Sequence, residues 1–247
     1  MTEQAALYNS VAPLKNVSAL VALVDRVQAR SPSLPGMACF YGPSGFGKST
    51  AAIYAANKFQ AYSVQVKSCW TKKKLCEAIV VEMGLKSART IADMVDQIAE
   101  QLALTDRPLL IDEADHLVAR KMIEIVRDIY EGCQAPVILI GEERLPQALR
   151  QWERVHGRML SWVQAEPGDL SDVHHLARLY CPGVHLSDDF KAKLLQGARQ
   201  SIRRICVNLD QVSEFARTRG LERIDLEVWG DRGFFDGVAP APRRFAA

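Results

Sequence analysis

Residues 42–50 read "GPSGFGKST" and fit the pattern G-x-x-x-x-G-K-[ST]. Glycines let a backbone turn its N–H groups onto phosphate oxygens, Lys48 can reach the β- and γ-phosphates, and the Ser49 hydroxyl can bind Mg²⁺. A chance lysine in a Gly-rich turn is the alternative, but an apolar run before and a helical pattern after supply the required context. We therefore predict an ATP and Mg²⁺ site formed by Gly42, Pro43, Ser44, Gly45, Phe46, Gly47, Lys48, Ser49 and Thr50.

A second motif, the acidic "LLIDE" at 109–113, places Asp112 and Glu113 at the carboxyl end of an apolar run. Ligands of open parallel sheets bind at that end of the strands. Asp112 can hold Mg²⁺ through its water shell, and Glu113 can act as a base on the attacking water. The alternative is a pair of solvated acids that open a helix.

The letters "DEADH" at 112–116 also occur in DEAD-box helicases. The chain is short for two tandem helicase cores, and a second α/β domain is absent from the pattern. Residues 114–116 are therefore interpreted as the start of a helix, with Asp115 as its cap.

Apolar periodicity predicts strands that alternate with helices up to about residue 166, which indicates a parallel sheet covered by helices on both faces. The expected strands are 37–41, 61–67, 108–112, 135–143 and 159–166. The expected helices are 17–30, 48–60, 71–84, 90–104, 116–131 and most of 144–158. Beyond "EPG" at 166–168, three helices (169–180, 187–198 and 201–218) and no strand are expected.

These patterns predict four parts of the chain. They are an N-terminal segment and helix (1–35), a phosphate-loop α/β core (36–166), a small all-helical lid subdomain (167–230) and a flexible tail (231–247).

Composition indicates an ordinary soluble globular protein, with 48% hydrophobic and 24% charged residues. No apolar run approaches the roughly 18 residues of a membrane span, and the N-terminus lacks signal-peptide features, so a cytoplasmic protein without a membrane partner is expected. Six single cysteines and five scattered histidines favour reduced thiols over disulfides or zinc. The stretch 26–76 has eight basic and no acidic residues, which is an electrostatic footprint for an anionic partner.

Basic residues suited to double-stranded DNA follow the second predicted strand. Lys72, Lys73 and Lys74 in "SCWTKKKL" could contact phosphates, which gives affinity without sequence specificity. The alternative is a solvated helix start, although lysine is not favoured at a helix N-terminus. Arg120 and Lys121 form a second candidate pair, whereas Trp70 is expected to pack rather than stack on bases.

Several arginines could stabilise charge on a leaving phosphate, either in cis or from a neighbouring subunit. Arg150, Arg154 and Arg158 are four residues apart, which predicts one helical face. Arg158, near the end of that helix, is the preferred arginine finger, and a solvated basic face is the alternative. In "SIRRICVNL", Arg203 could reach the γ-phosphate from the lid, unless both it and Arg204 are merely solvated.

The order of phosphate loop, Asp-Glu pair, arginine-bearing helix and helical lid resembles the AAA+ ATPases over residues 8–220. Within them the chain is most similar to the transposition ATPases, the B proteins of Mu-like transposable phages and their relatives in Tn7-type elements. The resemblance rests on "FYGPSGFGKSTAA", "LLIDEADHL", "VILIGEE" running into "RLPQAL", and "GRMLSWVQAEP".

This resemblance implies an ATPase of a bacterial or phage-infected cytoplasm that assembles on double-stranded DNA as a homo-oligomeric filament or ring. It also implies a transposase partner, which receives the target DNA and promotes ATP hydrolysis. In that family the segment after the second strand faces the axis of the assembly.

Two departures from the family pattern are visible. Only about 35 residues precede the first predicted strand, too few for a helix-turn-helix domain, so DNA binding is expected from the ATPase core. Acidic residues, with Glu142 as the candidate, stand where relatives carry a small polar sensor. The alternatives are a helicase-loader-like ATPase, against which the short N-terminus counts, and a nucleotide-switched scaffold, against which the intact Lys48, Asp112 and Glu113 count.

Overall fold

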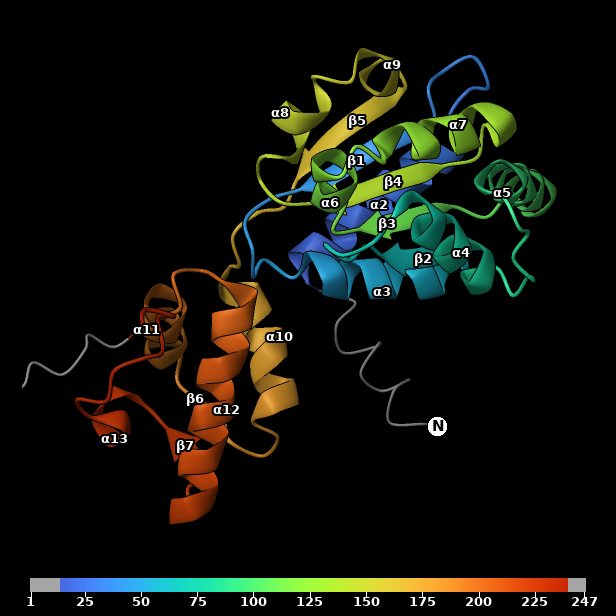
Figure 1. Ribbon diagram of the computed structural model, residues 1–247. Helices are drawn as coiled ribbons and strands as arrows, with labels where there is room; N and C mark the ends of the chain where they lie inside the picture. The colour runs from blue at the N-terminus through green and yellow to red at the C-terminus, as the bar shows by residue number, and fades with distance from the viewer. Residues whose placement is uncertain (1–13, 240–247) are drawn as a thin grey trace, which may run out of the picture. The chain divides into compact units, whose positions relative to one another are not determined.

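The computed structural model describes residues 14–239 and divides into two compact units, with the boundary between Glu166 and Pro167 (Figure 1). The first unit holds a five-stranded sheet with its helices, and the second is mainly helical. Among the described residues, no helix has the length and apolar character needed to cross a membrane.

The first unit is built on a sheet of parallel strands in the order β2-β3-β4-β1-β5. The three central strands are buried along almost their whole length, as expected for strands covered on both faces. The predicted parallel sheet is thereby confirmed. The strands are β1 (Met37–Tyr41), β2 (Tyr62–Gln65), β3 (Leu109–Asp112), β4 (Val137–Gly141) and β5 (Met159–Gln164).

Strand β2 forms one edge of this sheet. Tyr62 N–H and Val66 N–H point towards β3, where they donate to the carbonyls of Pro108 and Asp112. On the outer side, Ser63 N–H donates to Glu82 Oε1 at 3.2 Å. A side chain from the following helix therefore occupies a backbone donor of the open edge.

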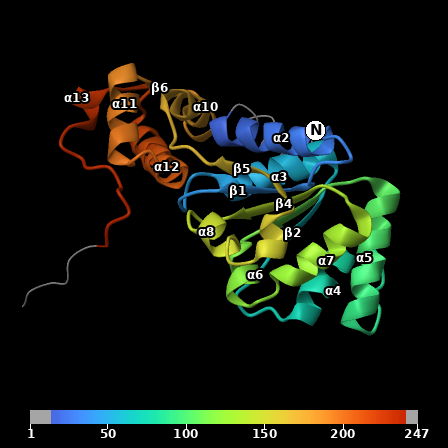
Figure 2. The same ribbon diagram turned by 90° about the horizontal axis from the view of Figure 1, so that it is seen from above.

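Helices cover both faces of the sheet (Figure 2). α2 (Lys15–Gln28) and α3 (Lys48–Phe59) pack together on one face, while α4 (Lys72–Glu82), α5 (Ile91–Thr105) and α7 (Ile123–Cys133) lie on the other. The short helices α6 (Asp115–Ala119), α8 (Leu145–Leu149) and α9 (Glu153–His156) complete the unit. Helices on both faces explain why the central strands read as continuous apolar runs.

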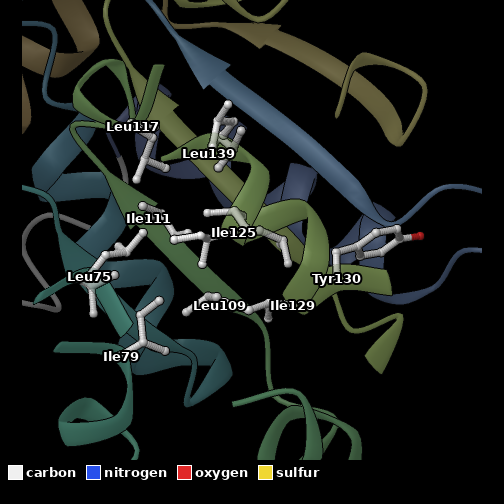
Figure 3. Close-up of a cluster of buried hydrophobic side chains, with 14 of the residues drawn as sticks. Leu75, Ile79, Leu109, Ile111, Leu117, Ile125, Ile129, Tyr130 and Leu139 are labelled. Atoms are coloured by element: carbon white, nitrogen blue, oxygen red, sulfur yellow. The ribbon is translucent and has the colours of Figure 1, made fainter. Parts of the chain in front are cut away.

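The main core lies between the sheet and α4, α6 and α7 (Figure 3). Leu109 and Ile111 of β3 and Leu139 of β4 are fully buried there, against apolar residues of these helices. The buried hydroxyl of Tyr130 accepts a hydrogen bond from Gly36 N–H at 2.8 Å, so the core also fixes the start of β1. This packing holds β1, β3 and β4 in register.

The helix predicted over 116–131 is broken, which corrects that prediction. α6 ends at Ala119, Lys121 adopts a left-handed φ of 53°, and Met122 N–H donates to Leu117 O at 2.7 Å. This is the Schellman pattern of a helix C-terminus, in which an N–H beyond the end of the helix donates back to a carbonyl of its last turn. Residues five apart do not share a helical face, so the break allows both Leu117 and Met122 to be buried.

The helical segment predicted over 144–158 is also interrupted. α8 starts at Leu145, with Pro146 in its first turn, Trp152 has a non-helical backbone conformation, and α9 is a single turn. Arg150 follows α8, Arg154 lies within α9 and Arg158 lies beyond it. The expectation that these arginines share one helical face is therefore wrong.

The second unit contains three main helices with a small parallel strand pair. Asp169 and Asp172 form a reciprocal capping box at the start of the first helix. The pairing of β6 with β7 corrects the prediction of an all-helical subdomain, since two-residue strands leave no alternating pattern to read. The elements are α10 (Leu170–Tyr180), β6 (His185–Leu186), α11 (Asp188–Gly197), α12 (Ile202–Arg219), β7 (Arg223–Ile224) and α13 (Leu226–Trp229).

The segment after α13 packs on the second unit as far as it is described. Phe234 stacks on Trp229 with ring centroids 5.7 Å apart. The buried Asn208 side chain bonds both Phe235 N–H, at 2.7 Å, and Phe235 O, at 3.0 Å. These contacts differ from the flexible tail predicted from residue 231, because a buried asparagine supplies a partner that composition does not reveal.

Candidate nucleotide-binding site

The loop of residues 42–47 joins the carboxyl end of β1 to the start of α3. Gly45 and Gly47 have φ angles of 85° and 84°, in the left-handed region that favours glycine. A Cβ at Gly42 would lie 3.0 Å from the Ala165 Cβ and 3.2 Å from its carbonyl oxygen, so this position is restricted by close approach. The Gly47 N-cap supplies no side chain to the first-turn N–H groups of α3, which suits them to an anion.

Lys48 is the first residue of α3, and its side chain turns back onto this loop. Its Nζ donates to Gly42 O at 2.7 Å and to Pro43 O at 2.9 Å. Burial lowers the pKa of Lys48, and the charges of nearby carboxylates act against that shift. Those carboxylates belong to Asp112, Glu113, Glu142 and Asp115.

The predicted acidic pair lies beside this lysine because β1, β3 and β4 are parallel neighbours whose carboxyl ends meet at one edge. Asp112 is 6% exposed, and its Oδ1 accepts from Glu113 N–H at 2.9 Å. Glu113 has a left-handed φ of 56°, a conformation that costs a non-glycine residue roughly 1 kcal/mol or more. Burial, and then the charge of Asp112, raise the pKa of Glu113.

Asp115 has a different place from the predicted one. It is the first residue of α6 rather than its cap. Its Oδ2 accepts a hydrogen bond from Glu142 N–H at 2.7 Å, so it holds the backbone just beyond β4. A Cβ at Gly141 would meet this carboxylate at 2.3 Å, which explains why glycine ends the strand. Burial raises the pKa of Asp115, while the bond from Glu142 N–H opposes the shift.

The charge balance of these side chains fits a magnesium nucleotide. The charges of four carboxylates act on Lys48, and a bound triphosphate would add further negative charge. A divalent cation would offset this excess of negative charge. Among the described residues, no group of three or more His, Cys, Asp or Glu could hold a metal ion. Mg²⁺ is commonly bound through one or two protein oxygen ligands together with substrate phosphates, and the exposed Ser49 hydroxyl and the Asp112 carboxylate are ligands of that type.

Asn16 joins the site without having been predicted. Its Nδ2 donates to Phe46 O and to Glu166 O, both at 2.8 Å, and its Oδ1 accepts from Glu166 N–H at 2.9 Å. The sequence carried a signal, since Asn16 falls on the apolar stripe of α2 with Leu20 and is 5% exposed. A polar residue on a buried face needs partners, but partners 30 and 150 positions away cannot be read from the pattern.

The arginine candidates are not brought to the Lys48 site within the first unit. Arg158 lies at the amino-terminal end of the strands, where its carbonyl accepts from Met37 N–H and its guanidinium pairs with Glu131. Arg150 and Arg154 are exposed. Arg203 lies in the first turn of α12, in the second unit.

The lysine candidates lie at the start of α4. Lys72, Lys73 and Lys74 are all exposed, and Lys73 Nζ lies 3.8 Å from Glu77. Arg120 and Lys121 are exposed in the break between α6 and α7. Trp70 packs against the main core, as expected.

Comparison with known proteins relates this arrangement to a described family. A family profile described as "AAA domain" matches residues 30–149, just under half of the chain. A comparison with curated proteins gives no match.

Solved structures show wider similarity. The ORC2 protein of Aeropyrum pernix, in ADPNP and ADP complexes, gives a TM-score of 0.63 at 13% identity and covers 86% of this chain and 65% of its own. The Aeropyrum pernix ORC1 protein in complex with DNA gives 0.59 at 19% identity, with 86% and 62% covered. The Thermotoga maritima RuvB Holliday junction branch migration motor gives 0.59 at 18% identity, with 87% and 66% covered.

The first unit therefore has the P-loop AAA+ fold, and the helical portion after residue 166 is present as predicted. The chain spans less than two thirds of the length of each of these three structures. The narrower resemblance to transposition ATPases stays a prediction, because neither the profile nor these structures is specific to that group.

Glu113→Gln is expected to raise the melting temperature of the nucleotide-free protein by about 1–3 °C at about pH 7.5. Burial and Asp112 raise the pKa of Glu113, so the charged carboxylate destabilises the folded state. Because the folded pKa lies above the unfolded one, this penalty is absent below the unfolded value, grows as pH rises from the unfolded to the folded value, and is complete above the folded value. The gain should therefore shrink towards about pH 4, measured by thermal unfolding.

Glu143→Gln is the matched control, since Glu143 is exposed. It should leave the melting temperature unchanged. An equal or lower melting temperature for Glu113→Gln at neutral pH would contradict a site in which burial and Asp112 penalise the charged Glu113.

Proposed function

We propose that this protein is an Mg²⁺-dependent ATPase that oligomerises on double-stranded DNA. The observation that carries the proposal is the position of Lys48, half-buried between the loop carbonyls of Gly42 and Pro43 and the carboxylates from the ends of β3 and β4. A candidate phosphate-binding loop, the Lys48 cation and the candidate base Glu113 thus lie together at the carboxyl ends of the strands. The AAA domain profile over residues 30–149 supports the same activity.

The residues of the first unit divide the chemistry among them. The N–H groups of residues 44–50 would bind phosphate oxygens, and Lys48 would exchange its two loop carbonyls for the β- and γ-phosphates. Ser49 and Asp112 would hold the magnesium ion, which neutralises charge developing on the phosphates. Glu113, whose pKa is raised by burial, would orient the attacking water and take its proton. Glu142 is proposed as the sensor beside the γ-phosphate, fixed through its N–H by Asp115.

The arginine required at the transferred phosphate is proposed to come from a second copy of the chain. Arg158 lies where the parallel strands begin, whereas Lys48 lies where they end. Arg158 therefore cannot serve the site of its own first unit. Its pairing with Glu131 would have to open for it to act in a neighbour. Arg154, which is exposed on α9, is the alternative finger, and Arg203 is proposed as the second sensor.

A basic surface is proposed to bind the DNA backbone. Lys72, Lys73 and Lys74 occupy the first turn of α4, where a helix N-terminus disfavours positive charge. α4 and α6 both follow the carboxyl ends of strands, and Leu75 and Leu117 belong to the same core cluster. The lysine triplet and the exposed pair at 120–121 are therefore proposed to contact DNA phosphates, without sequence preference. The complex of the similar ORC1 protein with DNA is consistent with this proposal.

The cellular role proposed is the delivery of target DNA to a transposase in DNA transposition. Its support is the set of motifs that resemble the transposition ATPases, from "FYGPSGFGKSTAA" to "GRMLSWVQAEP". A helicase-loader role in replication is the alternative and is not favoured by any observation over the transposition role.

Lys48→Ala is expected to abolish ATP binding and hydrolysis, because it removes the cation that contacts the loop carbonyls. Binding of a fluorescent ATP analogue and phosphate release would be measured. Lys58→Ala is the matched control, because Lys58 lies on the same helix but faces Asp25 at 3.9 Å, and it should behave as wild type. Wild-type nucleotide affinity in Lys48→Ala would overturn the assignment of this loop.

Replacement of Lys72, Lys73 and Lys74 by alanine should weaken duplex binding equally for unrelated sequences. The slope of log affinity against log salt should decrease by about 0.9 for each DNA phosphate that the variant no longer neutralises. A triple variant of Lys58, Lys86 and Arg89 changes the net charge equally at exposed positions elsewhere and is the control. An unchanged slope in the α4 variant would place the DNA surface elsewhere.

Wild-type protein is expected to form filaments or rings on duplex DNA with ATP, but not with ADP or without nucleotide. Negative-stain microscopy under these three conditions measures this directly. Assemblies that depend on ATP support target-DNA delivery, and stimulation of ATP hydrolysis by a transposase would then test the partner. Assemblies formed equally without nucleotide contradict the proposed coupling of ATP to DNA.

A further inference from the structure

One side chain ties three distant segments of the first unit together. Asn16, at the start of α2, bonds the phosphate loop at Phe46 and both backbone polar groups of Glu166. Lys15 pairs with the Glu166 carboxylate. Glu166 is the last residue of the first unit, and Pro167 begins the second.

We propose that Asn16 is a positioning residue that transmits the state of the phosphate loop to Glu166, where the chain leaves the ATPase unit. This inference rests on the proposed ATP site. It assigns a specific role to a residue outside the phosphate loop and the acidic pair.

Peptide planarity supplies the mechanical link. The Phe46 carbonyl and the Gly47 N–H belong to one planar peptide unit and point in opposite directions. A rotation that turns Gly47 N–H onto a phosphate oxygen therefore changes the position of Phe46 O relative to Asn16 Nδ2, which donates to it at 2.8 Å. Such a rotation changes ψ of Phe46 and φ of Gly47, and glycine at position 47, with its left-handed φ of 84°, tolerates the change.

The chemistry of the contact requires an amide. Two carbonyls must be met by donors, and one N–H must be met by an acceptor. Asparagine offers two donors and an acceptor in one side chain, whereas a carboxylate offers acceptors alone. Because Asn16 is 5% exposed, water cannot readily replace a missing bond.

A second contact limits how Glu166 can respond. Ala165 N–H donates to Tyr41 O at 2.7 Å, and Gly42 packs directly on Ala165. Residue 165 is thus fixed to β1 and to the first residue of the loop. Movement transmitted by Asn16 is confined to the peptide that follows, at Glu166.

Hydrogen exchange of the full-length protein, resolved to single amides, tests the coupling. Samples would contain no nucleotide, Mg²⁺ with ADP, or Mg²⁺ with a slowly hydrolysed ATP analogue. In wild type, exchange of the Glu166 amide should change severalfold on nucleotide binding. In Asn16→Ala, this amide should exchange about five- to tenfold faster without nucleotide, and the nucleotide response should disappear.

Asn16→Asp separates positioning from general stability. The carboxylate still accepts from Glu166 N–H but no longer donates to Phe46 O or to Glu166 O. Protection of the Glu166 amide without nucleotide should therefore persist while the nucleotide response disappears. Asn57→Ala, which removes an exposed asparagine bonded to Ile53 O on α3, should behave as wild type. The Ala165 amide, bonded to Tyr41 O, is an internal reference that should not change in any variant.

The outcomes separate this inference from the proposed function. If the variants bind a fluorescent ATP analogue and either Asn16 variant keeps the full response at Glu166, the coupling is overturned. If wild type binds the analogue but shows no response at Glu166, the coupling is again overturned and the ATP site stands. If wild type does not bind the analogue at all, the proposed function and this inference both fail.

Discussion

The parallel pairing of β1, β3 and β4 is the constraint on which the site depends. Each of these strands alone is a short apolar run, and none carries function by itself. Held side by side by a core that packs on β3 and β4, they end at one edge and deliver Lys48, Asp112 and Glu142 to one place. The acids then tune one another, because burial and mutual repulsion raise the pKa of both Glu113 and Asp115.

Much of this arrangement could be predicted from the sequence. The G-x-x-x-x-G-K-[ST] loop and the acidic pair are local patterns that can be recognised within a few residues, and buried strands are visible as apolar runs. The left-handed turn at Lys121 could not be predicted, because lysine carries no turn signal and the break exists to bury Leu117 together with Met122. The same limit applies to β6 and β7, whose two residues each are too few for a pattern.

Long-range polar contacts account for the other features of the structure that the sequence did not predict. Asp115 reads as a helix cap in sequence, yet its carboxylate holds the backbone beyond β4, because β3 and β4 are neighbours in space. Asn16 and Asn208 are similar cases, each a buried amide that meets both polar groups of one distant backbone residue. Such residues can be flagged from a polar position on an apolar helix face, but their partners become visible only in three dimensions.

The blocked edge of β2 restricts how copies of this chain could associate. Its outward backbone donors are limited to a four-residue strand, and the Glu82 carboxylate already occupies the one at Ser63. Continuous sheet extension from one copy to the next, which would produce a very stable and poorly reversible polymer, is therefore disfavoured at this edge. Association through helix and loop surfaces, by contrast, would be weaker and could be reversed.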